Sequence, residues 1–134
     1  MMFARFSPSA RAVVTLAEQE CRNASHYYLG TEHLLLAMAI APPPDVAGYF
    51  AAAGIEPWQV KRALRDAMDG ASDHPWEGVI VTPRVQRICA LAGQNSTGAV
   101  QPIHLLEAIV ADGGGVAARV LGQLQADTPA IRPG

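Results

Sequence analysis

The side chains in this sequence that are best suited to chemistry are its histidines and cysteines. There are four histidines and two cysteines, namely His26, His33, His74, His104, Cys21 and Cys89. No two histidines stand four residues apart with a third ligand nearby, as a helical zinc site requires. Neither cysteine is accompanied by a basic setting and an orienting third group that would activate a thiolate. The spacing therefore predicts no metal site and no catalytic residue, and we expect neither an enzyme nor a cofactor.

The same residues fit structural roles. Both cysteines fall on helical patterns, where a cysteine without a secretory signal is typically a small buried hydrophobe. His33 and His104 open two similar strings, His-Leu-Leu-Leu-Ala-Met and His-Leu-Leu-Glu-Ala-Ile, which predicts a packing role that occurs twice. Trp58 and Trp76 are also expected to pack, with Trp76, in an expected loop, the better candidate for a contact site.

A glycine triplet at 113–115 raises the question of nucleotide binding. Val116 follows the triplet where a phosphate-binding loop has lysine, and the pattern Gly-x-x-x-x-Gly-Lys-Ser/Thr does not occur in the 134 residues. We expect the triplet to separate two helices. ATP hydrolysis by that mechanism is not expected of this sequence.

Composition narrows the class of protein. A chain of 134 residues that is 50% hydrophobic suits one domain with a real core. A net charge of −2, with 16% charged residues, offers no broad basic field for a phosphate backbone, so we expect no nucleic-acid partner. No apolar run approaches the roughly 18 residues of a membrane span, and the amino terminus lacks the pattern of a signal peptide. The expectation is a cytoplasmic protein that does not bind membranes.

Helical periodicity dominates the chain. Apolar residues recur at spacings of three and four after Ser7-Pro8, and further starts are predicted at Thr31, Asp45, Pro57, Thr82-Pro83 and Gln101-Pro102. Thr31 and Asp45 are expected to act as helix caps. The predicted helices cover about 8–24, 31–41, 45–54, 57–70, 83–95, 102–112 and 116–125, with a connector at about 70–80 and a tail at 126–134.

The helices come in two similar sets. Ser7-Pro8 returns as Thr82-Pro83, and Val46-Ala47 returns as Val116-Ala117, in the same order as the two histidine strings. A repeat this short buries its apolar face only against its copy, so we expect one pseudo-twofold, all-α module. Repeat one covers about 3–70 and has four helices. Repeat two covers about 81–125 and is shortened, which gives about seven helices in total.

Several strings carry a resemblance to a known family. Gly-Thr-Glu-His-Leu-Leu at 30–35, Val-Thr-Pro-Arg at 81–84 and Val-Ala-Ala-Arg-Val-Leu at 116–121 resemble, in order and separation, the amino-terminal double repeat of ClpC/ClpA-type unfoldases. The resemblance covers about residues 3–125. It implies a module that receives client and adaptor proteins for an ATP-driven unfoldase, here as a stand-alone protein without the ATPase modules.

The resemblance also implies site residues. In ClpC-type members the Thr-Glu pair helps to bind phosphorylated arginine, and Thr31 and Glu32 match that pair; the alternative is that they only cap a helix. Pro102-Ile103 replaces the pair in repeat two, so at most one such site is expected. An apolar partner patch in the family is matched by Phe3, Val14, Val81, Arg84 and Arg87, although Phe3 and Val14 could instead close the core.

Three functions remain open at this point. The first is a module that binds peptides, adaptors or clients of a Clp unfoldase and modulates Clp-dependent proteolysis. The second is a decoy that sequesters a small molecule such as a cyclic peptide aimed at the unfoldase. The third is a purely structural role in assembly.

Overall fold

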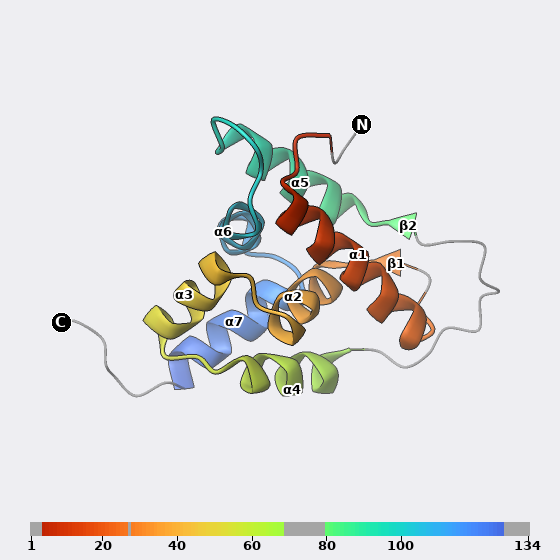
Figure 1. The fold of residues 1–134 in the computed structure, drawn as a ribbon. Coiled ribbons are helices and arrows are strands. Elements are labelled where there is room, and N and C mark those ends of the chain that lie inside the picture. Colours follow the sequence, from red (N-terminus) through yellow and green to blue (C-terminus); the bar gives the residue numbers. More distant parts are fainter. Residues whose placement is uncertain (1–3, 27, 69–79, 128–134) are drawn as a thin grey trace.

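The fold consists of seven helices and two very short strands among the residues that the structure describes. A computed structural model of the protein describes residues 4–26, 28–68 and 80–127 (Figure 1). Repeat one contains α1 (Pro8–Asn23), β1 (Tyr28–Leu29), α2 (Thr31–Ile40), α3 (Pro44–Ala53) and α4 (Pro57–Ala67). Repeat two contains β2 (Ile80–Val81), α5 (Pro83–Gln94), α6 (Pro102–Asp112) and α7 (Val116–Asp127). The all-α prediction, with four helices and then three, is confirmed over these residues.

Proline and a hydroxyl cap define the two helices that open the repeats. The Ser7 side chain accepts a hydrogen bond from the Ala10 backbone N–H at 3.1 Å, and Pro8 is the first residue of α1. In the same way the Thr82 Oγ1 accepts from the Val85 N–H at 3.3 Å before α5. Proline suits the first helical position because that N–H has no intrahelical acceptor. Both predicted helix starts are confirmed, and Ser7 and Thr82 are their caps.

Two other predicted caps are wrong. Gly30 is the N-cap of α2, so Thr31 is the first helical residue and its hydroxyl does not cap its own helix. Pro43 is the N-cap of α3, and Asp45 lies in the first turn. The Asp45 carboxylate instead accepts from the backbone N–H of Ile103 at 3.0 Å, in the first turn of α6. The dipole of α6 favours a negative charge at this end of the helix. Asp45 therefore joins the two repeats instead of capping α3.

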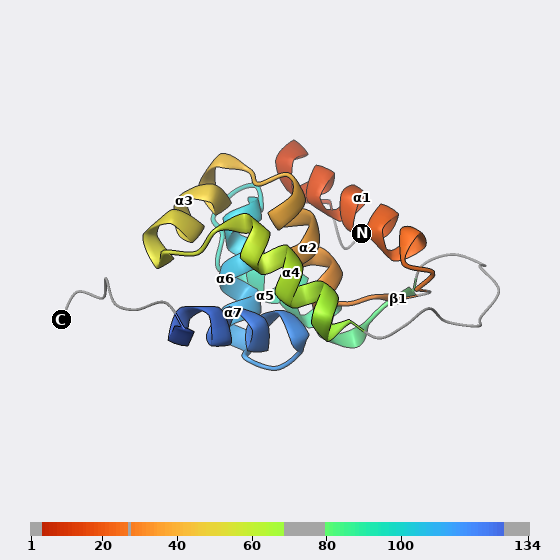
Figure 2. The same ribbon diagram turned by 90° about the horizontal axis from the view of Figure 1, so that it is seen from below.

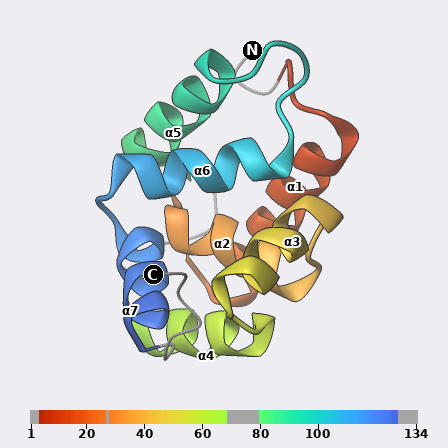
Figure 3. The same ribbon diagram turned by 90° about the vertical axis from the view of Figure 1, so that its left-hand side faces the viewer.

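Helix α2 forms the centre of the molecule. Residues 31–39 are all buried, and α1, α4, α6 and α7 pack around this helix (Figures 1 and 3). No single helix in the described part of the chain is long and apolar enough to cross a membrane. The pair α2 and α3 meets the length and composition criteria only when taken together across a 95° bend.

Short parallel pairings tie the two repeats together. Tyr28 pairs with Ile80 and Leu29 with Val81, while Phe6 forms a separate parallel bridge with Val100. In both places the residues before the first helix of one repeat pair with the residues before the second helix of the other. These pairings are too short to leave a period-two pattern in the sequence, which predicted no strands. Because each repeat completes the other, the expectation of a single module fits the structure.

Candidate functional site

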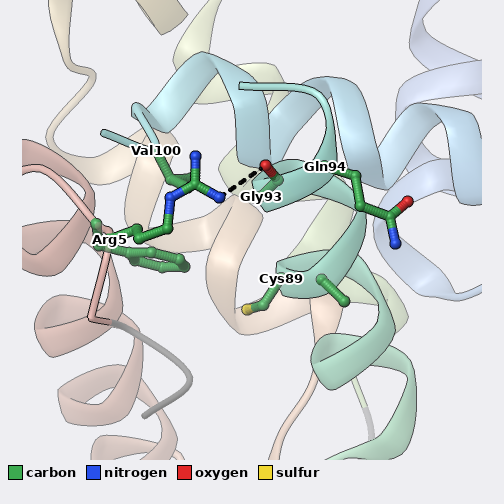
Figure 4. A pocket seen from close by; sticks show the side chains of 7 residues that line it. Arg5, Cys89, Gly93, Gln94 and Val100 are labelled. Atoms are coloured by element: carbon green, nitrogen blue, oxygen red, sulfur yellow. Dashed lines mark hydrogen bonds between the residues drawn. The ribbon is translucent and has the colours of Figure 1, made fainter. Parts of the chain in front are cut away.

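A cavity lies where the amino-terminal segment of repeat one meets repeat two. Its volume is about 310 Å³. The amino-terminal segment contributes Arg5 and Phe6, α5 contributes Cys89, Ala90, Gly93 and Gln94, and the segment before α6 contributes Val100 (Figure 4). The Phe6 and Val100 side chains are buried in the core, so one wall of the cavity is continuous with it. The cavity therefore combines apolar walls with one cation.

Arg5 is held at the cavity by the carboxyl end of α5. Its guanidinium donates to the backbone carbonyl of Gly93 at 3.0 Å (Figure 4). It also donates to the carbonyls of Ser96 at 3.1 Å and Gly98 at 2.8 Å. Carbonyls at a helix end lack intrahelical partners and favour a positive charge, so these contacts fix the cation in place. A guanidinium has five N–H donors, and Nε–H makes no hydrogen bond within the described residues. Arg5 therefore keeps a donor that no described residue uses.

Cys89 contributes a neutral thiol to the same cavity. Burial raises the pKa of the Cys89 thiol to about 11, so the group is protonated at neutral pH. Burial, and then the charge of Glu32, raises the pKa of Cys21 to about 12. Both cysteines are free and buried, which confirms the structural interpretation of these residues.

The residues of the predicted partner patch lie in different environments and do not form one exposed surface. Val14 is only 6% exposed and belongs to the core, so the structure does not place it on a binding surface. Val81 is half-buried and packs against the core. The Arg84 guanidinium forms an ion pair with Asp112 at 2.5 Å, whereas Arg87 is exposed. Phe3 lies outside the described residues.

The cavity is the pseudo-twofold counterpart of that patch. In the repeat alignment Val14 corresponds to Cys89, and Val81 corresponds to Phe6. Cys89 and Phe6 therefore form, on the other half of the molecule, the pair that is equivalent to Val14 and Val81. Glu18, in the first repeat, is replaced by Gly93, whose small size helps to leave the space open. The repeat offset, applied to Val14 and Val81, is the signal in the sequence that points to Cys89 and Phe6.

Thr31 and Glu32 are both buried at the start of α2, with exposed fractions of 3% and 8%. The Thr31 Oγ1 accepts from the Ala117 backbone N–H at 3.3 Å, and the Tyr28 hydroxyl donates to a Glu32 carboxylate oxygen at 3.4 Å. A Cβ at Gly30 would overlap the Glu32 carboxylate, so a larger residue there would require the Glu32 side chain to move. The pair is thus brought together, at a helix N-terminus, with Thr31 engaged across the repeats.

The two equivalent histidines have the same local role. His33 Nδ1 accepts from the Gly30 N–H at 3.0 Å, and His104 Nδ1 accepts from the Gln101 N–H at 2.9 Å. Each ring therefore caps its own helix, as the duplication predicts for a repeated structural role. His33 Nε2 also lies 2.8 Å from His26 Nδ1. Burial, and then the neighbouring His26, lowers the pKa of His33 to about 4.

The tryptophan predictions had different outcomes. Trp58 is 56% exposed, so the expectation that it packs inside the protein is wrong. Trp76 and His74 lie outside the described residues.

Among the residues that are described, no three His, Cys, Asp or Glu side chains gather in a way that could hold a metal ion.

Comparisons with known proteins agree on one family. The sequence model of the Clp repeat (R) N-terminal domain matches residues 5–98. The chain is 32% identical over 135 residues to an ATP-dependent Clp protease ATP-binding subunit ClpA homolog of Cyanidium caldarium, covering 98% of this chain. It is 29% identical over 128 residues to the chaperone protein ClpB of Oceanobacillus iheyensis, covering 92% of this chain. It spans only 16% of the length of each of these relatives.

Solved structures show the same fold. The ClpV N-domain in complex with a VipB peptide matches with a TM-score of 0.79 at 19% identity, covering 94% of this chain and 80% of that one. The N-terminal domain of ClpD from Arabidopsis thaliana matches with a TM-score of 0.68 at 21% identity, covering 91% of this chain and 88% of that one.

Proposed function

Because the chain belongs to the Clp repeat (R) N-terminal domain family, we propose that it is a protein-binding module that receives peptide segments of clients or adaptors of a Clp unfoldase. The observation that carries this proposal is the cavity between Arg5 and α5. The ClpV N-domain, which has the same fold, has been solved with a VipB peptide, and this supports a peptide as the ligand class. Through such binding the module modulates Clp-dependent proteolysis.

The cavity suits an apolar side chain of a peptide with an adjacent backbone oxygen. A volume of about 310 Å³ is at the lower end of the roughly 300–1,000 Å³ of ligand pockets, so it accepts a small part of a larger ligand. Phe6, Val100 and the neutral Cys89 thiol provide apolar contacts. The Arg5 Nε–H provides a charge-assisted donor for a carbonyl or carboxylate oxygen.

Binding of an unfolded protein tests the site. Fluorescein-labelled casein, which lacks a stable fold, serves as the probe in a fluorescence-anisotropy titration. The exposed Ala90 lines the cavity, so Ala90→Phe fills it without disturbing the core and is expected to weaken binding about tenfold. Ala52→Phe, at an exposed position on α3, is the matched control and is expected to bind like the wild type. Equal affinities for the two variants would remove the cavity from the site.

The effect on proteolysis needs its own assay. The chain is added to the Clp unfoldase and protease of its own organism, and degradation of a labelled client is followed with time. A change in the degradation rate that is lost in Ala90→Phe supports modulation. An unchanged rate at concentrations that saturate client binding contradicts modulation while leaving the binding function intact.

A second candidate function is sequestration of a small molecule such as a cyclic peptide aimed at the unfoldase. The apolar side chains of the cavity, beside a single fixed cation, favour it. Calorimetric titration with such a cyclic peptide separates the two functions. Tight binding of the cyclic peptide without binding of casein supports the decoy, and the reverse result contradicts it.

A further inference from the structure

A second surface, far from the cavity, is formed by the outer side of α4. At 100° per residue, Trp58, Lys61, Arg62 and Arg65 fall within an arc of about 100° on this helix. The opposite side carries Val60 and Leu64, which are fully buried. We call the four residues Trp58, Lys61, Arg62 and Arg65 the α4 outer face. Helix α4 runs along the bottom of Figure 1 and lies at the front of Figure 2, whereas α5 lies at the top of Figure 1.

The aromatic residue of this face is unusually exposed. Trp58 is 56% exposed, although a tryptophan normally buries most of its large apolar surface. No helix in the described part of repeat two corresponds to α4, so the pseudo-twofold packing gives Trp58 no equivalent and no partner. Tryptophan and arginine are the residues most enriched at the energetic centres of protein interfaces.

The charges of the face are largely uncompensated. The Arg65 side chain is 61% exposed, and its guanidinium lies 4.0 Å from the Glu20 carboxylate, the outer limit of an ion pair. Lys61 and Arg62 form no ion pair within the described residues. Asp66 lies at the edge of the arc, and Glu56 lies at the amino end of α4. Three cations thus share this face with Trp58, in a chain whose net charge is −2.

We infer that the α4 outer face is a docking surface for an acidic protein segment that carries an apolar side chain. Carboxylates of the segment pair with Arg62 and Arg65, and its apolar side chain covers the Trp58 indole. Charge complementarity favours the acidic partner, because among the described residues the only ion pair of these three cations is the one between Arg65 and Glu20, at 4.0 Å. A nucleic acid is disfavoured by the negative net charge of the whole chain.

Tryptophan fluorescence reports occupancy of this face directly. The chain has two tryptophans, so Trp76→Phe leaves Trp58 as the single reporter. The probe is a synthetic heptapeptide of six Asp and Glu residues around a central Leu, and its control has Asn and Gln in place of the acids. We expect a saturable blue shift with the acidic peptide that weakens about tenfold between roughly 0.05 M and 0.5 M salt, and none with the control. Equal responses to both peptides would overturn the proposal.

Two variants of equal charge change locate the site. Arg62→Gln/Arg65→Gln and Thr15→Glu/Thr97→Glu each lower the net charge by two, the second pair at exposed positions outside α4. In the Trp76→Phe background, we expect the arginine pair to weaken binding of the acidic peptide at least about tenfold and the threonine pair to weaken it less than about twofold. Equal weakening by both pairs would show a general charge effect and contradict the proposal.

Two further measurements distinguish this proposal from binding of the peptide in the cavity and from binding of a nucleic acid. Ala90→Phe is expected to bind the acidic peptide normally, because the cavity lies on the other side of the molecule; loss of binding there would place the peptide in the cavity and overturn the inference. A single-stranded oligonucleotide with six phosphates is the last arm. Tighter binding of the oligonucleotide than of the peptide would contradict a protein partner.

Discussion

The Thr31 Oγ1 accepts a hydrogen bond from the backbone N–H of Ala117, which joins the first turn of α2 to the first turn of α7 across the two repeats. Ala117 is fully buried, so no water replaces the hydroxyl if it is removed. Thr31→Val is therefore expected to lower the free energy of unfolding by about 1–3 kcal/mol. Urea denaturation measures this. Thr31→Ser retains the hydroxyl and is expected to lose less than half as much; equal losses would show that packing of the methyl group dominates.

Arg5 ties the amino-terminal segment to the end of α5 through three backbone carbonyls. Arg5→Lys keeps the charge but replaces the planar fork by a single ammonium group, which cannot reach all three. We expect a loss of about 1 kcal/mol in the free energy of unfolding, together with weaker casein binding. Arg87→Lys is the control, since the exposed Arg87 makes no hydrogen bond within the described residues. If both variants unfold alike, the carbonyl contacts do not contribute.

The buried histidine pair makes stability depend on pH. The Gly30 N–H donates to His33 Nδ1, so Nε2 carries the proton and donates to His26 Nδ1. A second proton on His33 would break one of these bonds, consistent with its lowered pKa of about 4. The unfolded chain, with an ordinary histidine pKa of about 6.5, binds more protons between these values. Stability conferred by the neutral ring is therefore full above about pH 6.5 and is lost as the pH falls toward 4.

The size of this effect follows from linkage. The pKa of His33 is about 2.5 lower in the folded protein than in the unfolded chain. This difference lowers the free energy of unfolding by about 3 kcal/mol between pH 7 and pH 4. Urea denaturation at several pH values measures the slope in the wild type and in His33→Gln, whose amide does not titrate. We expect the variant to be less stable at pH 7 and to show a shallower decline on acidification. Parallel slopes in the two proteins would contradict the role of His33.

At most one phosphoarginine site is expected, and Glu32 is its predicted acid. The Glu32 carboxylate lies at the amino end of α2, where a guanidinium would pair with the acid and a phosphate with backbone donors. Calorimetric titration with free phosphoarginine is expected to show one site, weakened about tenfold or more by Glu32→Ala. Ile103→Ala, at the equivalent position of repeat two, is expected to leave binding unchanged. Equal affinities of wild type and Glu32→Ala would remove Glu32 from the site, and two sites would contradict the asymmetry.

The helices were predictable because their starts are encoded locally. Pro57 and Pro102 begin helices where the sequence predicts them, and the Ser7 and Thr82 hydroxyls cap helices at two further predicted starts. These signals involve residues only three or four positions apart, so one sequence suffices to read them.

The cross-repeat contacts were not predictable in this way. Thr31 and Asp45 are good capping residues, yet both bind the first turn of a helix in the other repeat. The parallel pairings of Leu29 with Val81 and of Phe6 with Val100 likewise join segments far apart in the chain. Local sequence preference predicts that residues of these types bind the start of a helix, but it does not show which helix they bind.

The candidate site was half predictable. The sequence directed attention to Val14 and Val81, and the structure shows a cavity at the pseudo-equivalent residues Cys89 and Phe6. Small side chains favour open space there, with Gly93 and Ala90 in place of Glu18 and Thr15. Trp58 was misplaced for a related reason, because helical periodicity alone does not show whether a neighbouring element covers a tryptophan.

The most direct test of the account is to map, by amide chemical-shift changes in the ¹⁵N-labelled protein, where an unfolded peptide from casein binds. The largest changes are expected at the residues that line the cavity, and they should vanish in Ala90→Phe but persist in Ala52→Phe. The lining residues are Arg5, Phe6, Cys89, Ala90, Gly93, Gln94 and Val100. Changes confined to other surfaces, or unaltered changes in Ala90→Phe, would contradict the claim that this cavity receives the peptide.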